Sequence, residues 1–249
     1  MRQYCTLLIL VFMLCGNVSA QEQLDSSTEK AMIVLAEMGA HLSSLDSFKV
    51  QSHATFDEPM SGQLVEHSQI TEVMASRTRG FRMNTRGDLM HSSAFFNGSD
   101  FVMYDRDRKL YAMAPFKGTL HELTDHAAKN LGVILPAAEL MRKDPAEALL
   151  EDAETLFYVG FDLVDETPCH HVAARNKNGM EWELWVEDTT LLPRKILVRD
   201  ATLPGSPRSV AVFSNWELNP VLPDMIFNFL IPSDAEQIEF RLTKNGGQK

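Results

Sequence analysis

Cysteine is scarce in this 249-residue sequence, and most of it lies near the start of the chain. The three cysteines are Cys5, Cys15 and Cys169. If the first twenty residues are removed, as argued below, one thiol remains and no intramolecular disulfide can form. An exported chain without disulfides depends on its own hydrophobic core, and this length suffices for one ordinary domain.

Positive charge is also in short supply. The chain has 23 Lys and Arg against 34 Asp and Glu, which gives a formal net charge of −11. Nucleic acids are bound through clustered Lys and Arg, and no basic run here exceeds two residues. Nucleic acid is therefore excluded as a partner, and anionic membrane surfaces are disfavoured. With 45% hydrophobic residues, the composition is that of a globular protein.

The common catalytic and cofactor motifs are missing. No Gly-x-Ser-x-Gly elbow occurs, and neither the P-loop nor the Gly-x-Gly-x-x-Gly pattern is present. The sequence thus predicts no catalytic residue, no cofactor and a protein that is not an enzyme.

Long apolar runs are limited to one, from Leu7 to Cys15. It has the length of a signal-peptide core and is too short to span a bilayer. Small residues at Val18 and Ala20 place cleavage after Ala20, so we predict a signal peptide over 1–20 and a periplasmic protein, not an integral membrane protein. The alternative is a lipoprotein acylated on Cys15, although Leu14 stands where that signal needs a small residue.

Helical periodicity begins after the signal. Ser26 and Glu29 have capping-box spacing and predict a helix start. The stripe that follows shares one helix face and must pack on a larger element. It comprises Met32, Leu35, Met38 and Leu42.

Period-two alternation dominates the rest and predicts antiparallel strands. They cover residues 48–56, 64–75, 78–84, 91–96, 101–104, 110–114, 156–164, 169–175, 181–186, 194–198, 210–218 and 237–242. A helical insertion at about 119–152 interrupts them. Gly132, Pro136 and Pro145 divide it into short helices, which we interpret as a lid. The fold class is therefore α+β: a single domain over 21–249 with a curved antiparallel sheet and helices covering one face.

Four segments in this order resemble a family of predicted periplasmic proteins, domain of unknown function 2092. They are GVILPAAEL from Gly132, YVG from Tyr158 with CHHV from Cys169, WELWV from Trp182 with LPRK from Leu192, and the ending FSNWELNPVLPDMIFNFLIPSDAEQIEF. The resemblance covers Gly39 to Phe240. That family is similar in layout to the lipoprotein carriers LolA and LolB, which implies an incomplete antiparallel barrel with helices across its mouth and an apolar cavity between. Related architecture serves in lipid-binding lipoproteins and in a periplasmic regulator, so the resemblance implies no activity.

Several polar clusters could carry chemistry, and each is better explained structurally. Cys169 and His171 share a strand face while His170 points away, and two ligands do not make a zinc site. The histidines of the His121–His126 segment are five apart, not the four of a zinc-binding helix. Carboxylates at Glu181 and Glu183, and at Glu151, Asp152 and Glu154, are expected to face solvent. No metal site is predicted.

The methionines and aromatics suggest a ligand instead, because Met suits an adaptable apolar surface. We place a hydrophobic ligand cavity between sheet and lid, lined by Phe81, Met83, Phe101, Met103, Met113, Leu123, Leu135 and Leu140. The same residues also suit plain core packing. The leading hypothesis is a non-enzymatic periplasmic binding protein for a lipid, lipoprotein, acyl chain or other hydrophobic small molecule. The alternative is a regulatory module that binds a peptide or envelope protein partner at a strand edge.

Overall fold

The computed structural model describes residues 5–131, 133 and 142–240, with the backbone alone for 5–24. A long helix, α1 (Cys5–Ser44), precedes six strands: β1 (Ser47–Met60), β2 (Gln63–Ser76), β3 (Gly80–Gly87), β4 (His91–Phe96), β5 (Asp100–Asp105) and β6 (Leu110–Pro115). Three short helical elements follow: α2 (Leu120–His126), the π-helical turn η1 (Ala127–Leu131) and α3 (Pro145–Leu150). The second half contains β7 (Ala153–Val164), β8 (Thr167–Asn176), β9 (Met180–Glu187), β10 (Pro193–Asp200), β11 (Arg208–Leu218), the 3-10 turn η3 (Asp224–Phe227) and β12 (Glu236–Ile238).

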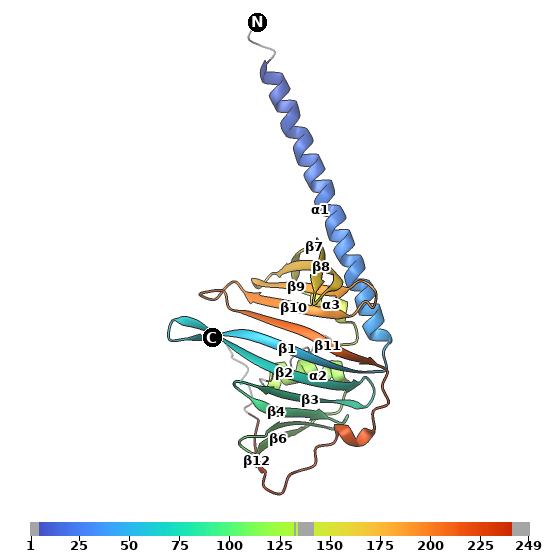
Figure 1. Cartoon of the computed structure of the whole chain (residues 1–249), viewed down its shortest axis with the longest axis vertical. Coiled ribbons are helices and arrows are strands. Elements are labelled where there is room, and N and C mark those ends of the chain that lie inside the picture. The colour runs from blue at the N-terminus through green and yellow to red at the C-terminus, as the bar shows by residue number, and fades with distance from the viewer. Residues whose placement is uncertain (1–4, 132, 134–141, 241–249) are drawn as a thin grey trace, which may run out of the picture.

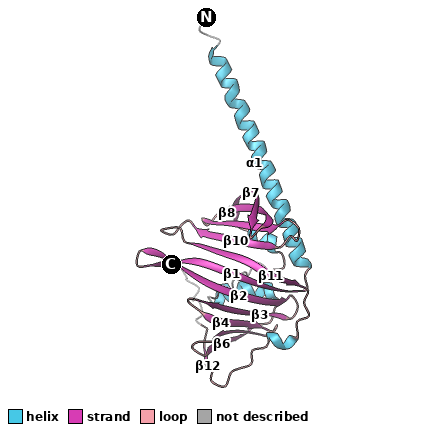
Figure 2. Cartoon of the chain, in the orientation of Figure 1, coloured by secondary structure: helices cyan, strands magenta, loops and turns pink. Residues whose placement is uncertain are grey.

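The described strands form one curved sheet in the order β12-β6-β5-β4-β3-β2-β1-β11-β10-β9-β8-β7. Figure 1 shows the strands stacked from β12 at one end to β7 at the other, with α1 projecting beyond the β7 end. Neighbouring strands are antiparallel except at β12, which runs parallel to β6. The predicted α+β class, with a curved antiparallel sheet and helices on one face, is confirmed (Figure 2).

The main core lies on the helix-covered face of the sheet. Alternation places every second side chain there, and the register aligns the large ones across strands. Phe48 pairs with Ala75, and Phe81 lies between Ala75 and Phe96. Buried residues of α1, α2 and η1 complete this cluster, which extends across both halves of the sheet.

The outer face has two smaller clusters. One packs Phe95, Tyr104 and Tyr111 under Phe229, which comes from the segment between η3 and β12. The Phe229 ring centroid lies 5.3 Å from each of those three rings. The other cluster comprises Val164, Cys169, Trp185 and Leu197. The sheet is therefore only partly exposed on its outer face.

Two expectations for the first helix are wrong. The helix continues through Ser26, so that residue is no N-cap; instead Ser27 Oγ bonds to the backbone of Tyr158 in β7 at 3.0 Å. Met32 is 52% exposed. The buried row consists of Ala31, Leu35, Met38 and Leu42, so Ala31 takes the place of Met32. The sheet beneath α1, and not the helix alone, decides which side chains are buried.

The last strand also differs from expectation. The sequence predicts a strand over 237–242 in an antiparallel sheet, whereas β12 covers Glu236–Ile238 and pairs in parallel with β6. Positions 241 and 242 of the predicted strand lie outside the described residues. The parallel direction arises because the chain crosses the end of the sheet between β11 and β12 instead of turning back in a hairpin. Among the described residues, no helix has the length and apolarity to cross a membrane.

Candidate functional site

The predicted cavity residues lie mostly together on the helix-covered face. Phe81, Met83, Phe101 and Leu123 are buried in the main core cluster, and the half-buried Met103 packs against it. Phe101 lies between Phe81 and the ring of Phe240, at centroid distances of 6.4 and 5.7 Å. Leu135 and Leu140 lie outside the described residues. Five of the eight expected residues therefore share one apolar environment.

Met113 is placed differently from the expectation. It pairs with Val102 across β5 and β6 and packs on the outer face, in the cluster of Phe95 and Tyr104. Its neighbour Ala114 faces the main core instead. Because successive strand residues point to opposite faces, Met113 cannot line a space beneath the helices. Met113 is therefore not a cavity residue, and that part of the prediction is wrong.

The helices over this surface are short and locally capped. Thr119 and Glu122 form a capping box at the start of α2, with Glu122 Oε2 accepting from the Thr119 amide at 2.7 Å. Asp144 caps α3, whose first residue is Pro145. Leu120, Leu123, Ala127 and Leu131 recur every three or four residues along α2 and η1, and all four are buried.

Arg77, in the turn between β2 and β3, ties three elements together. Its guanidinium donates to the carbonyls of Leu42 at 2.6 Å, Leu45 at 2.9 Å and Arg142 at 2.8 Å. Burial lowers the pKa of Arg77 from its ordinary value. Arg142 in turn pairs with Asp125 of α2 at 2.7 Å. The end of α1, the α2 helix and the segment leading into α3 are thus linked through the side chains of Arg77 and Arg142.

A groove of about 1360 Å³ lies between α1, α2 and α3. Its walls include Ala36 and Ala40 of α1, and Ala146 and Leu150 of α3, with charged residues around them. Here α3 approaches α1 so closely that a Cβ added at Gly39 would lie only 2.7 Å from the Cβ of Ala146. The groove adjoins the edge of the helix-covered core.

The β7 edge is a second surface of interest. β7 is the last strand of the sheet, so one side of its backbone faces away from any strand. Ser27 and Thr28 of α1 bond to that side at Tyr158 and Leu156. Beyond them β7 exposes Val159, Phe161 and Leu163, with 49%, 57% and 66% of their surface accessible.

The Cys169-His170-His171 segment is arranged as the sequence predicts. Cys169 is fully buried, and burial raises the pKa of its thiol to about 11. His171, on the same face, stacks on Trp185 at 4.1 Å and contacts Glu183 at 2.9 Å. His170 lies on the other face, 3.0 Å from Asp188. Within the described residues, no group of three His, Cys, Asp or Glu side chains is placed to hold a metal ion.

Of the remaining acidic candidates, Glu151, Asp152 and Glu154 are exposed, as expected, and Glu181 and Glu183 have side-chain partners. Glu181 pairs with Arg175 and Arg199, which lowers the pKa of its carboxyl. Trp182 and Leu184 alternate with Glu181 and Glu183 and point into the main core, as expected. In α2, Asp125 pairs with Lys129 and Arg142. Asp125, Lys129 and Arg142 line the groove between α1, α2 and α3, whereas Glu181 pairs with arginines of neighbouring strands.

Comparison with known proteins identifies the family. Residues 31–241 match the family described as "Predicted periplasmic protein (DUF2092)". The chain belongs to the DUF2092 family. Comparison with curated proteins finds no match. The match agrees with the resemblance stated from the sequence, and the periplasmic location predicted there is confirmed.

Solved structures similar to this DUF2092 protein have low sequence identity to it. An uncharacterized conserved protein from Thermus thermophilus is 12% identical, with a TM-score of 0.51 over 84% of this chain and 99% of that one. LprF from Mycobacterium bovis is 13% identical, with a TM-score of 0.46 over 84% and 99%. A LolA superfamily protein from Nitrosomonas europaea is 14% identical, with a TM-score of 0.39 over 82% and 98%.

One feature of this DUF2092 protein is missed entirely by the sequence reasoning. A pocket of about 660 Å³ lies on the outer face of the sheet, and three arginines line it: Arg82, Arg86 and Arg106. The even spacing of Arg82 and Arg86 on β3 signals a shared face. Arg106 looks like part of an exposed charged turn, and only the strand pairing brings it to the other two.

Proposed function

We propose that this DUF2092 protein is a non-enzymatic periplasmic binding protein that holds a hydrophobic ligand, such as an acyl chain, between the sheet and the helices α2, η1 and α3. The observation that carries the proposal is the kind of cover over the apolar face. Three elements of seven, five and six residues close it. Isolated helices of that length are unstable in water, so their order depends on docking to the sheet.

Opening these helices uncovers a suitable surface. Phe81 and Met83 lie on β3, and Phe101 lies on β5, with β4 between the two strands. Met103, also on β5, adds a flexible side chain that adapts to irregular ligands. The groove between α1, α2 and α3 gives a route to this surface from solvent. An apolar ligand that takes the place of the helices against the sheet keeps these side chains out of contact with water.

The energetics are compatible with an acyl chain. Each buried methylene contributes about 0.8 kcal/mol, so a chain of roughly ten methylenes gains about 8 kcal/mol. Association and ordering cost an estimated 4–15 kcal/mol. Binding at useful affinity therefore needs a chain at least that long, and a much shorter chain fails.

Hydrogen exchange with two fatty acids tests the proposal. Without ligand, the amides of 120–131 and 145–150 should exchange faster than those of 156–164, and laurate should protect them while hexanoate does not. Equal protection of all three segments without ligand, unchanged by laurate, would refute the proposal.

A pair of variants makes the test specific to the helix-covered face. Met103→Trp fills space beneath the helices and should abolish protection by laurate. Met113→Trp places the same bulk on the outer face of the neighbouring strand and should leave protection intact. Equal effects of the two variants would contradict the proposed location.

The β7 edge favours a second candidate function, the binding of an extended peptide from an envelope protein by β-strand addition. Exposed Val159, Phe161 and Leu163 beside an open strand edge support it. A photo-crosslinking amino acid at Leu163 should give a discrete adduct in the periplasm. The same group at Leu203, in an exposed turn, should not; adducts at both positions or at neither would exclude this candidate.

A further inference from the structure

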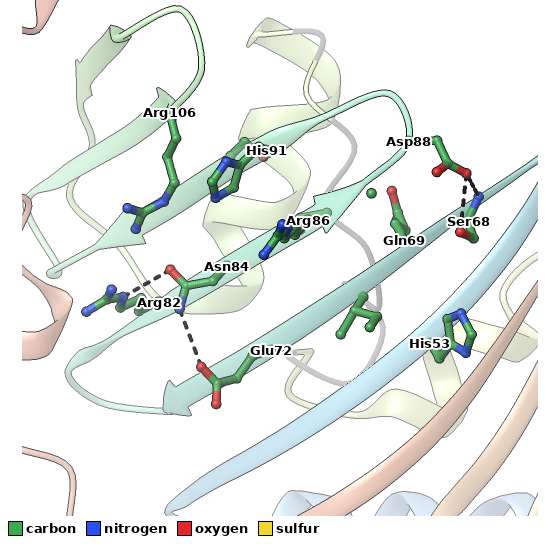
Figure 3. A pocket seen from close by; sticks show the side chains of 14 residues that line it. His53, Ser68, Gln69, Glu72, Arg82, Asn84, Arg86, Asp88, His91 and Arg106 are labelled. Carbon is green, nitrogen blue, oxygen red and sulfur yellow. Dashed lines mark hydrogen bonds between the residues drawn. The ribbon is translucent and has the colours of Figure 1, made fainter.

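The pocket on the outer face is built across β2, β3, β4 and the turn after β5. Figure 3 shows Arg82, Arg86 and Arg106 extending over the same side of these strands, with Asn84 between the first two. Cross-strand pairing aligns Ile70, Arg86 and His91 in one row. The backbone amide of Arg106 bonds to the carbonyl of His91 at 2.9 Å, which fixes the turn at the end of that row.

These three arginines differ from the other arginines of the described chain. The others form ion pairs with carboxylates, apart from Arg77, which bonds to carbonyls; the paired ones are Arg79, Arg108, Arg142, Arg175, Arg194, Arg199 and Arg208. Within the described residues, Arg82, Arg86 and Arg106 have no carboxylate within ion-pair distance. In a chain with 34 acidic residues, neighbouring arginines without such partners require another explanation.

Two of the three guanidinium groups are held in place by neutral contacts. Arg82 Nε donates to Asn84 Oδ1 at 3.3 Å, and Arg106 Nε donates to Ser93 Oγ at 2.9 Å. Ser93 Oγ donates in turn to Asn84 Oδ1 at 2.9 Å, which joins the two arginines through one network. Arg82 also lies 5.2 Å from the ring of Phe95. These contacts use the Nε atoms, and the terminal nitrogens of both groups make no hydrogen bond within the described chain.

The two carboxylates of the pocket, Glu72 and Asp88, bond to groups other than the three arginines. Glu72 accepts from Asn84 Nδ2 at 3.5 Å (Figure 3). Glu72 pairs with Lys49 at 3.3 Å. Asp88 accepts from the amide and hydroxyl of Ser68 at 2.7 and 3.2 Å, and these bonds lower the pKa of its carboxyl. Burial, with the nearby charge of Arg106, lowers the pKa of Arg82. The charge of Glu72 acts on the pKa of Arg82 in the opposite direction, but no described carboxylate lies within ion-pair distance of the three arginines.

We propose that this pocket binds a phosphate group, carried by a small molecule or by a lipid headgroup. Arginine forks match phosphate oxygens with two parallel hydrogen bonds, and three forks suit an anion with several oxygens. The volume of about 660 Å³ is that of a small-ligand site. The site is separate from the helix-covered face, so it stands or falls independently of the proposed function.

Calorimetric titration of the folded chain with pyrophosphate tests the proposal. One pyrophosphate should bind per chain, and binding should weaken as salt is added because the attraction is screened. Arg86→Gln and Arg106→Gln should each weaken binding by about tenfold or more, as expected for the loss of a charged hydrogen bond. Arg86 is exposed and makes no side-chain hydrogen bond within the described chain, so its variant leaves the fold unperturbed.

Arg199→Gln is the matched control. It removes the same charge from the same face of the sheet, but Arg199 pairs with Glu181 far from the pocket. It should leave binding unchanged. No binding of pyrophosphate, or equal weakening by all three variants, would overturn the proposal.

Soluble dihexanoyl phosphatidylglycerol distinguishes the two sources of phosphate. Binding of both probes, with the same sensitivity to Arg86→Gln, assigns the pocket to a lipid headgroup. Binding of pyrophosphate alone assigns it to a small phosphorylated molecule. Binding of the lipid that is insensitive to Arg86→Gln and Arg106→Gln counts against the pocket.

Discussion

Arg77 is expected to hold the helical cover on the sheet, and Arg77→Ala tests this directly. The substitution removes three hydrogen bonds of 2.6–2.9 Å, two to the C-terminal end of α1 and one to Arg142. It leaves the apolar contacts of α2 and η1 with the sheet in place. The effect of the variant therefore measures how strongly this link orders the cover.

The magnitude follows from the character of the bonds. A hydrogen bond from a charged donor contributes about 1.5–3 kcal/mol net. The carbonyls of Leu42 and Leu45 lie at a helix end and regain water when Arg77 is lost, so the three contributions do not add fully. We expect a loss of about 3 kcal/mol in the free energy of unfolding. For a chain of this size, each kcal/mol of lost stability lowers Tm by about 2–4 °C, so the variant should show a fall in Tm of about 6–12 °C.

Thermal unfolding followed by circular dichroism measures the loss, and hydrogen exchange locates it. Exchange should accelerate at 120–131 and at the end of α1, with β7 unchanged. Arg77→Lys keeps the charge without the fork and should give an intermediate Tm. Arg79 lies in the same turn as Arg77 and bonds to Leu222 and Asp224 instead. Arg79→Ala should therefore leave hydrogen exchange at 120–131 unaltered. A loss below about 1 kcal/mol for Arg77→Ala would refute the reasoning.

Three further outcomes are expected. In the chain from Gln21 onward, the Cys169 thiol, with a pKa of about 11, should be about 0.1% ionised at pH 8 and should not react with Ellman's reagent until the protein is denatured; prompt reaction of the native protein would contradict its burial. Phe229→Ala should cost about 2–3 kcal/mol in chemical denaturation, because a half-buried ring in contact with three others is removed; a change near zero would show that the C-terminal segment is undocked. Hydrogen bonds from Trp185 and the Leu163 amide lower the pKa of Asp162. The ionised carboxylate therefore stabilises the fold at pH values above the ordinary pKa of Asp, and this stabilisation is lost as the pH falls through the lowered pKa. The difference in Tm between the wild type and Asp162→Asn should shrink below about pH 4.

The strands were predictable from the sequence because the alternation is local. Phe48, Val50, Ser52 and Ala54 repeat every second residue, and this periodicity is fixed by the geometry of an extended chain whatever it packs against. The same holds for the faces of Cys169, His170 and His171. The signal peptide over 1–20 stays a prediction from the apolar run before it.

The faces that a helix buries were less predictable. The stripe through Leu35, Met38 and Leu42 is predicted correctly, yet Met32 is exposed and Ala31 takes its place, since the sheet decides which side of α1 is covered. Met113 is misassigned for a related reason. Periodicity says that neighbours on a strand face opposite ways, but it does not say which face a helix will cover.

What the sequence determined by itself is the α+β class, the strand order along the chain and the periplasmic setting, because each depends on short-range patterns of polarity. Only the tertiary structure decided which side chains from distant parts of the sequence lie close together. Arg82 lies on β3, and Arg106 lies 24 residues later in the turn after β5. The pairing of β3, β4 and β5 brings both residues to one pocket, in a chain whose net charge argued against nucleic acid and anionic membrane surfaces. Such a site depends on register and long-range pairing, and residue spacing along a single strand carries no record of either.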